Sequence, residues 1–343
     1  ISFYRAADLG SPGTSGRRRW SYSGSQWDGS SVYRSNIDLT LASNYDLILH
    51  EIGHSLGLKH PGNYDVGGNN PPGPFLPAAE DNDKFTVMSY NQNPDSGTES
   101  RHLMLYDIAA LQLFWGVNSS ARTGNDTYTG PDDGIIQAIW DAGGVDTLQY
   151  NGALAAVLDL RAGTFSSLGA TDNLAIAYGV TIENATGGSG NDTLRGNDAA
   201  NIITGNGGDD TGSGYGGNDV MLGGLGVDTL DGGTDFDNLY GGGGDDTLRG
   251  GANEDILVGD AGNDTLYGDS GGDILSELFD PVNSGNDTFF GGDGVDIMYS
   301  AAGNDSVDGG SDTANNYANL GDGDDTYTGS AGNDVVEGAA GMD

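Results

Sequence analysis

The sequence contains no cysteine, few basic residues and no long apolar segment. Without a cysteine among its 343 residues, the chain has no disulfide framework, no thiolate metal site and no cysteine nucleophile. Twelve lysines and arginines stand against 51 acidic residues, a formal charge of −39, which excludes an electrostatic binder of nucleic acids. No apolar run approaches the ~20 residues that span a bilayer, so we expect no membrane span.

Glycine and acidic side chains are abundant instead, and both gather in the second half of the chain. The sequence has 62 glycines, and from Gly187 to the end it has 31 acidic residues against two basic ones, Arg195 and Arg249. All four histidines precede Gly187. This shift in composition predicts the main domain boundary near residues 182–188. An acidic, glycine-rich chain without cysteine favours hard cations such as calcium.

A nine-residue repeat organises the second half. Ten unbroken nonapeptides run from Gly187 to Ser276, and two of them read GGSGNDTLR and GGGGDDTLR. The eighth position is apolar except at Gly212, and the sixth is aspartate except at Asn201. The register slips by five residues around 277–281 and by two near Asn315. The sixth-position aspartates, before and after the slips, are Asp192, Asp210, Asp219, Asp228, Asp237, Asp246, Asp255, Asp264, Asp273, Asp287, Asp296, Asp305, Asp325 and Asp334.

This repeat is typical of calcium-binding parallel β-solenoids. Glycines at positions one, two and four permit turns and leave carbonyl groups bare, while the eighth residue faces inward on a strand. Two nonapeptides make one coil, and coils ~4.8 Å apart bring sixth-position carboxylates face to face, where two charges repel by about 3 kcal/mol. A calcium ion between repeat n and repeat n+2 would reverse that repulsion. The alternative, a flexible glycine-rich linker, would not keep a nine-residue phase.

A second motif lies in the first half, where residues 50–60 read HExxHxxGxxH. On a helix, His50 and His54 project from one face, and Gly57 lets the chain turn so that His60 returns as a third nitrogen ligand. Three neutral nitrogens with one open position are typical of a catalytic zinc site. Glu51, beside the first ligand, can take a proton from water. The alternative is a helix with satisfied surface histidines.

The combination resembles the serralysin family, secreted bacterial zinc endopeptidases with a β-roll behind a metzincin protease domain. The matching segments are HEIGHSLGLKHPG at 50–62, VMSY at 87–90, DIAALQ at 107–112, WDAGG at 140–144 and GVTIENATGGSGND at 179–192. The third segment lies on a helix expected at 105–115 from its apolar spacing, which Gly116 can cap. The resemblance covers nearly the whole chain.

The resemblance implies roles for individual residues. Zinc would bind His50, His54, His60 and, at rest, Tyr90. Glu51 would be the catalytic base, Tyr90 would also stabilise the tetrahedral intermediate, and Met88 would form an apolar floor under the metal. Calcium at the junction would bind Arg122, Gly124, Asp126, Asp141, Gly143, Gly144, Asp146, Thr181 and Glu183. In the repeat, calcium would bind Gly188, Gly190, Gly205, Gly207, Gly208 and the sixth-position aspartates named above.

We therefore predict an α+β metzincin-like catalytic domain at 1–116, junction strands at 117–186 and an all-β parallel β-roll solenoid at 187–343. Only 49 residues precede His50, so we expect the catalytic domain to be truncated at its N-terminus, and we expect no secretion-signal segment in the chain.

The predicted function is that of a secreted, extracellular zinc metalloendopeptidase, and the resemblance implies export by type I secretion. It would be a monomer with one zinc ion, several structural calcium ions, protein or peptide substrates and an inhibitor protein as a further partner. The alternative is a non-catalytic calcium-binding module or an inactive relic of such a protease. A polysaccharide-modifying enzyme lacks support, because nothing before Gly187 reads as a right-handed β-helix of pectate-lyase type.

Overall fold

The computed structural model describes residues 21–23, 26–28, 45–62, 75–95, 97, 100, 102–130, 135–277, 285–329 and 331–342. These residues belong to two compact units, the first comprising Ile1–Val117 and Ile135–Ala138 and the second the remainder of the chain. Residues 1–20 and 29–44 of the predicted protease domain lie outside the described range. The metzincin-like α+β fold of that domain therefore stays a prediction.

The described part of the first unit contains two helices and one short hairpin. Strands β1 (Ser21–Ser23) and β2 (Gln26–Asp28) pair antiparallel, and the helices are α1 (Tyr45–Leu56) and α2 (Leu105–Trp115). Helix α2 has the predicted bounds, and Gly116 ends it with a φ of 82° while its N–H donates to the carbonyl of Gln112. None of the described helices is long and apolar enough to cross a bilayer.

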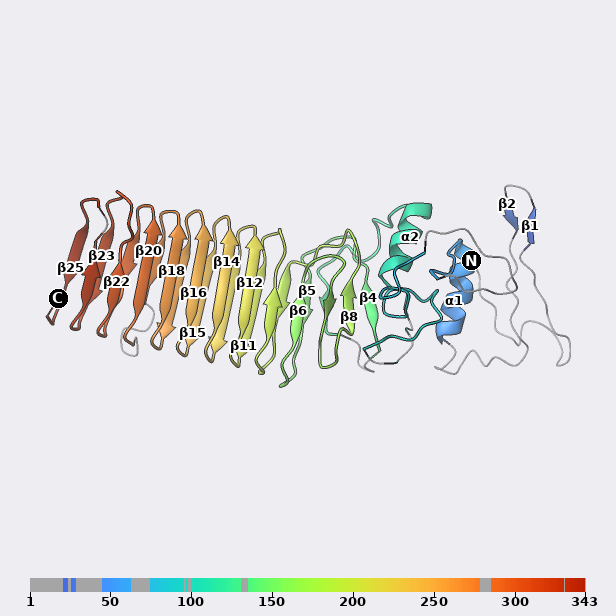
Figure 1. Cartoon of the computed structure of the whole chain (residues 1–343), viewed down its shortest axis with the longest axis horizontal. Helices are drawn as coiled ribbons and strands as arrows, with labels where there is room; N and C mark the ends of the chain where they lie inside the picture. Colours follow the sequence, from blue (N-terminus) through green and yellow to red (C-terminus); the bar gives the residue numbers. More distant parts are fainter. Residues whose placement is uncertain are drawn as a thin grey trace. The chain divides into compact units, whose positions relative to one another are not determined.

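The second unit is a solenoid of two long parallel sheets, which confirms the predicted β-roll (Figure 1). The eleven-stranded sheet of the described residues contains β3 (Thr127–Tyr128), β5 (Thr147–Gln149), β9 (Asn184–Thr186), β11 (Ile202–Gly207), β13 (Val220–Leu225), β15 (Asn238–Gly243), β17 (Ile256–Ala261), β19 (Ile274–Ser276), β21 (Ile297–Tyr299), β23 (Tyr317–Gly321) and β25 (Val335–Gly338). The nine-stranded sheet contains β6 (Val157–Asp159), β10 (Thr193–Arg195), β12 (Thr211–Gly216), β14 (Thr229–Thr234), β16 (Thr247–Ala252), β18 (Thr265–Ser270), β20 (Thr288–Asp293), β22 (Ser306–Asp308) and β24 (Thr326–Thr328).

Both sheets begin before the first glycine-rich nonapeptide, because β3, β5, β6 and β9 all precede Gly187. Three further short strands accompany them, β4 (Gln137–Ile139), β7 (Phe165–Ser166) and β8 (Leu174–Ile176). Strands β7 and β8 pair antiparallel, and the carbonyl of Ile139 in β4 accepts a hydrogen bond from the backbone N–H of Ala177. Segment 117–186 thus supplies the first coils on which the repeats stack.

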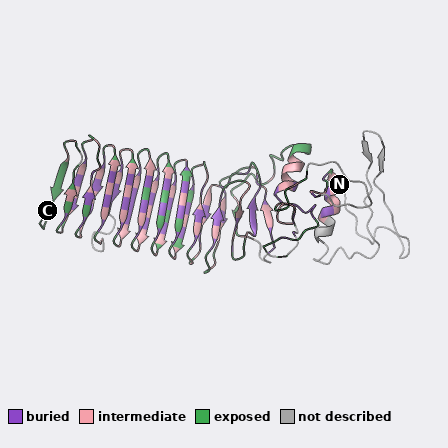
Figure 2. Ribbon diagram, in the orientation of Figure 1, coloured by how far each residue is buried: buried purple, intermediate pink, exposed green. Residues whose placement is uncertain are grey.

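Successive strands alternate between the two sheets, so two nonapeptides make one coil as predicted. Parallel pairing joins residues one coil apart, as in Leu230 with Leu248 and Leu239 with Leu257. Apart from Gly212, the eighth-position side chains of the ten regular repeats are at most 2% exposed. Buried residues accordingly alternate with more exposed ones along the strands (Figure 2). The core is a column of single apolar side chains along each sheet.

The break in this column at Gly212 is filled by its neighbours. A Cβ atom added at Gly212 would lie 2.7 Å from Cε of Met221 and 2.9 Å from Cδ2 of Leu230. Both neighbours are buried. The long, flexible Met221 side chain therefore occupies the space that an eighth-position leucine would take, as methionine often does in irregular gaps.

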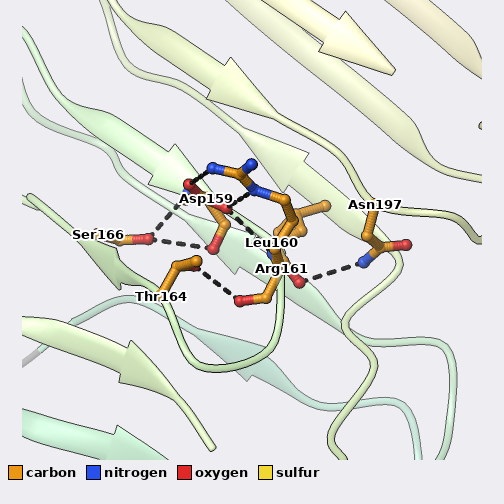
Figure 3. Close-up of polar contacts among 6 residues, drawn as sticks. All are labelled: Asp159, Leu160, Arg161, Thr164, Ser166 and Asn197. Carbon is orange, nitrogen blue, oxygen red and sulfur yellow. Dashed lines mark hydrogen bonds and ion pairs between the residues drawn. The ribbon is translucent and has the colours of Figure 1, made fainter. Parts of the chain in front are cut away.

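The nine-stranded sheet begins at β6, where polar contacts cover the strand end (Figure 3). The carboxylate of Asp159 accepts hydrogen bonds from Nε and Nη2 of Arg161 at 2.9 and 2.7 Å, and the Asp159 N–H donates to Oγ of Ser166 at 2.9 Å. Nearby, Nδ2 of Asn197 donates to the Leu160 carbonyl at 3.2 Å. The outer edge of β6 is itself covered, because Val157 and Ser167 exchange two backbone hydrogen bonds in an antiparallel bridge.

The apolar column predicts a large difference between two leucine truncations. Leu248→Ala removes a side chain with 0% exposure and should lower the free energy of unfolding by about 2–5 kcal/mol. Leu225→Ala, at a leucine that is 71% exposed, should change it by about 0.5 kcal/mol or less. Urea denaturation followed by circular dichroism at saturating calcium measures both. Equal effects of the two variants would contradict the column as the core.

Candidate metal centres

The end of helix α1 places the three motif histidines together. Gly57 follows the helix with a φ of 101°, its N–H donates to the carbonyl of His54 at 3.1 Å, and the N–H of Leu58 donates to the carbonyl of Gly53 at 3.0 Å. These two bonds form a Schellman motif, which reverses the chain at a residue with positive φ. The reversal brings His60 back beside His50 and His54, as the spacing of the motif predicts.

The Nε2 atoms of the three histidines converge on one point. The Nε2 atom of His60 lies 3.1 Å from that of His50 and 3.0 Å from that of His54. Tetrahedral ligands around zinc, with Zn–N bonds near 2.05 Å, lie about 3.3 Å from one another. The donor set and the separations of these nitrogens therefore fit a zinc ion bound by three imidazoles.

The other ring nitrogens of two histidines face backbone carbonyls. Nδ1 of His50 lies 2.8 Å from the carbonyl oxygen of Val87, and Nδ1 of His54 lies 3.1 Å from that of Leu58. Such contacts place the proton on Nδ1 and leave Nε2 for a metal. Burial, with repulsion from His54 and His50, lowers the pKa of His60 to about 4. The neutral imidazole, which metal binding requires, is thus the stable form of His60.

Tyr90 and Glu51 lie beside the histidines. The Oη atom of Tyr90 is 3.0 Å from Nε2 of His60, and the Tyr90 ring stacks on His50 with centroids 5.4 Å apart. Tyr90 is 58% exposed, so its ring can move without displacing core side chains. Burial of the hydroxyl and the charge of Glu51 raise the pKa of Tyr90. The hydroxyl therefore remains a hydrogen-bond donor at neutral pH.

Met88 packs against the helix that carries the histidines. It is 1% exposed, and a Cβ atom added at Gly53 would meet its Sδ atom. The turn around Met88 is fastened by Asp107 of α2, whose carboxylate accepts hydrogen bonds from Oγ1 of Thr86 at 2.6 Å and from the N–H of Val87 at 2.9 Å. The sequence analysis gave no role to Asp107, and only its position in the DIAALQ segment points to it.

A second candidate centre lies at the junction, where Asp126, Asp141 and Asp146 present carboxylate oxygens within 4.8 Å of one another. The backbone N–H of Asp146 donates to Oε2 of Glu183 at 2.7 Å. Oδ2 of Asp146 is buried and accepts no hydrogen bond, and burial raises the pKa of this carboxyl. An uncompensated buried carboxylate oxygen among carboxylates fits a cation.

The remaining predicted junction ligands divide into two groups. A Cβ atom added at Gly144 would meet the carbonyl oxygen of Gly124 and Oδ1 of Asp146, so these three residues lie close together. Gly143 has a φ of 132°, and its N–H donates to Oδ1 of Asp141. The other two, Arg122 and Thr181, are exposed, and the Arg122 carbonyl already accepts a hydrogen bond from the N–H of Ala142.

From Asp210 to Asp305, each sixth-position aspartate divides its two oxygens between two environments. One oxygen, Oδ1, accepts the backbone N–H of the sixth-position residue one coil earlier. The donor–acceptor distance is 2.7 Å from Asp210 to Asp228, from Asp228 to Asp246 and from Asp246 to Asp264. The other oxygen, Oδ2, is buried without a hydrogen-bond partner in Asp210, Asp219, Asp228, Asp237, Asp246, Asp255, Asp264, Asp273, Asp287, Asp296 and Asp305.

Neutral oxygens surround these unpartnered atoms. A Cβ atom added at Gly223 would meet both Oδ2 of Asp228 and the carbonyl oxygen of Gly241. The predicted ligand Gly205 is similarly placed, with Oδ2 of Asp210 and the carbonyl of Gly223 beside it. Carboxylate and carbonyl oxygens brought together in this way are the ligands that calcium prefers.

The start of the array differs from this pattern. Both oxygens of Asp192 have partners, since Oδ1 accepts from the N–H of Ala156 at 2.7 Å and Oδ2 from that of Gly188 at 2.6 Å. Gly190 approaches the backbone of Leu154 and Ala155 rather than a carboxylate. Of the two other predicted glycines, Gly208 has a φ of 106° and lies against the backbone of Gly190. A Cβ atom added at Gly207 would have one neighbour within 4 Å, a carbonyl oxygen 3.9 Å away.

The far end of the array contains a residue that the sequence analysis missed. Asn316 occupies the sixth position after the two-residue slip, because its Oδ1 accepts from the N–H of Asp296 and its own N–H donates to Oδ1 of Asp334. Asp325 continues the other stack by accepting from the N–H of Asp305. The signal was the resumed nine-residue spacing from 316 to 325 and 334, which an aspartate-only pattern does not detect.

Burial without a cation makes these carboxylates weak acids. Desolvation, with repulsion from neighbouring carboxylates, raises the pKa of Asp210, Asp246 and Asp273 from 3.8 to about 7. The same causes raise the pKa of Asp237 and Asp264 to about 6. Near neutral pH the array thus contains buried groups that are costly to ionise unless a cation binds.

Comparisons with known proteins match most of the chain. A sequence model of the family described as Peptidase M10 serralysin C terminal matches residues 106–334. The chain is 42% identical over 202 residues to the Serralysin of Proteus mirabilis, and the aligned region covers 53% of this chain and 41% of that protein. It is 37% identical over 227 residues to the Metallopeptidase AprA of Pseudomonas marginalis, and here the aligned region covers 56% of this chain and 48% of that protein. The matched part thus spans less than half of each relative's length.

The raised pKa values predict an inverted pH dependence for the calcium-free protein. A folded-state pKa above the unfolded value means that protonation favours folding, so this stability is complete below about pH 4 and is lost as pH rises through 6 to 7. Urea denaturation after calcium removal should therefore give a lower midpoint at pH 7.5 than at pH 5, and calcium should restore it at pH 7.5. A calcium-free protein equally stable at both values would contradict the buried, unpartnered carboxylates.

Proposed function

The chain belongs to the serralysin family of metalloproteases, and from this premise we propose that it carries the zinc site and the calcium-stabilised β-roll of a secreted endopeptidase. The substrates would be proteins or peptides, whose peptide bonds the enzyme would hydrolyse. The single observation that supports this most directly is the convergence of three Nε2 atoms, with Oη of Tyr90 3.0 Å from that of His60 and Glu51 next to His50 in the helix. That arrangement combines a zinc-binding set with a base and a hydrogen-bond donor.

Each residue of the site would have a separate chemical role. Zinc, when bound by His50, His54 and His60, would polarise the substrate carbonyl and acidify water. Glu51 would accept the proton of the attacking water and pass it to the leaving amine. Tyr90 would donate its hydroxyl hydrogen bond to the oxygen that becomes negative in the transition state.

Positioning of these groups depends on contacts behind them. Val87 orients the His50 imidazole through its carbonyl, and Asp107 in turn fixes the Val87 backbone. Met88 fills the space against Gly53 under the helix. Because a ligand ring held from its far side has one orientation, the site is organised before a metal arrives.

The β-roll would supply calcium-dependent stability. Each buried Oδ2 needs a cation, and extracellular calcium modules bind with dissociation constants of about 10⁻⁴–10⁻³ M. Such sites would remain empty at the low calcium concentration of a cytoplasm and fill outside the cell, which supports the secreted location that the family resemblance implies. The same proposal includes one zinc ion, several calcium ions, a monomeric state and an inhibitor protein as partner. It also keeps the domain limits at 1–116, 117–186 and 187–343.

A second candidate function is a calcium-binding module without catalysis. It is favoured by the share of the chain that the solenoid occupies and by the matched relatives, of which the aligned part spans only 41% and 48%. The two functions differ in one measurable property, since the module would bind calcium and would not hydrolyse peptides.

Glu51→Gln tests catalysis directly. In the intact protein this variant should keep its zinc and lose casein hydrolysis by about 10²- to 10⁴-fold, because the amide cannot accept the proton. Metal analysis and a hydrolysis assay measure the two quantities. Glu254→Gln makes the same chemical change at an exposed residue of the array and should leave both unchanged. Unaltered hydrolysis in Glu51→Gln would remove the proposed base.

Tyr90→Phe tests the hydroxyl. Its loss should lower kcat by about 10²-fold with little change in KM, because the hydrogen bond would strengthen only in the transition state. Steady-state kinetics on a peptide substrate separates the two constants. Tyr215→Phe, at a residue 41% exposed in the β-roll, is the matched control. A variant with raised KM and normal kcat would show that Tyr90 binds substrate instead.

A further inference from the structure

The five-residue slip in the repeat coincides with a change of residue type at one position. The first position is glycine in all ten regular nonapeptides, from Gly187 to Gly268, and the next first position is Glu277. The backbone of Glu277 still takes part in the ladder, because its N–H donates to the carbonyl of Tyr299 at 2.9 Å, as that of Gly196 donates to Ser213. An acidic side chain therefore stands where the repeat otherwise has none.

The Glu277 side chain is buried among carboxylates. It is 0% exposed, and neither of its carboxylate oxygens has a hydrogen-bond partner. Oxygens of Asp264, Glu277 and Asp287 lie within 4.8 Å of one another. Asp264 and Asp287 are stacked sixth-position residues, joined by the Asp264 N–H to Oδ1 of Asp287 at 2.8 Å, and each has an unpartnered Oδ2. Three buried carboxylates, each with at least one unpartnered oxygen, thus lie together.

Glu277 puts a charged oxygen where other coils have a neutral one. A Cβ atom added at Gly241 would lie 2.9 Å from the carbonyl oxygen of Gly259. The equivalent atom at Gly259, one coil later, would meet Oε1 of Glu277 instead. The Glu277 carboxylate therefore lies beside Oδ2 of the sixth-position Asp264, where other coils present a backbone carbonyl.

We propose that Asp264, Glu277 and Asp287 form a three-carboxylate cation site that binds calcium more tightly than the two-aspartate positions of the array and prefers trivalent ions. This inference rests on the proposed calcium binding of the β-roll and adds to it a site that the nonapeptide pattern does not contain. The affinity of oxygen sites rises with the number of charged ligands, since each added carboxylate strengthens the attraction to the cation.

Calcium titration of the full chain tests the site. Calorimetry on metal-free protein, with terbium as the trivalent probe, should show one calcium ion bound at least about tenfold more tightly than the others, and terbium should fill the same site first. Glu277→Gln retains a neutral oxygen ligand but removes the charge, so the tight phase should lose one ion and merge with the rest. Glu254→Gln, on the exposed surface of the preceding coil, should leave the titration unchanged.

Glu277→Gly separates binding from packing, because it restores the glycine of the regular repeats. This variant should reach the wild-type β content at saturating calcium and lack the tight site. An unchanged tight phase in Glu277→Gln, or loss of folding by Glu277→Gly even at saturating calcium, would overturn the proposal. A wild-type chain with calcium sites of equal affinity would refute this inference alone, whereas a chain that binds no calcium would refute the β-roll function beneath it.

Discussion

The β-roll depends on one unsatisfied atom that recurs along the chain. In most coils, Oδ1 of the sixth-position aspartate is part of the backbone ladder and Oδ2 is buried with no partner. The first contact fixes where the carboxylate lies, so the second oxygen cannot turn away to solvent. Glycine-rich turns and a core one side chain wide offer little else to offset the repulsion. If calcium fills these positions as proposed, binding the ion and folding the chain are one equilibrium.

The cluster of three histidines is built in the opposite way. Its imidazoles are neutral, and two of them are oriented by hydrogen bonds within the protein, from Nδ1 of His50 to the carbonyl of Val87 and from Nδ1 of His54 to the carbonyl of Leu58. Asp107 is buried like the aspartates of the array, but its carboxylate has three donors: Thr86, Val87 and Met104. A site whose side chains must keep one geometry through a reaction is held more rigidly when their hydrogen bonds are all satisfied within the protein. A site that serves only to fold the chain can leave its ligands incomplete.

Sequence alone could predict those features that short spacings encode. His50, His54 and His60 converge because a helix and one turn determine their positions, and the solenoid follows from periodicity. Asp107 escaped notice because its partners lie 20 residues away in a different segment. Glu277 and Asn316 escaped because insertions shift the phase. One oxygen of Asp192 is partnered by Ala156, which precedes the repeat, and the other by Gly188 inside it. The contacts of Asp107 and Glu277 join segments that no local pattern connects.

The regularity of the repeat has a consequence for how the chain finds its native pairing. Coils of similar sequence pair residues 18 apart, so a strand displaced by a whole coil would still match leucine with leucine and aspartate with aspartate. Many misaligned stackings would then be close in energy to the native one. Irregular positions remove this degeneracy: Met221 fits the gap at Gly212, and Glu277 meets its two aspartates in one alignment only. The defects of the array are what make its alignment unique.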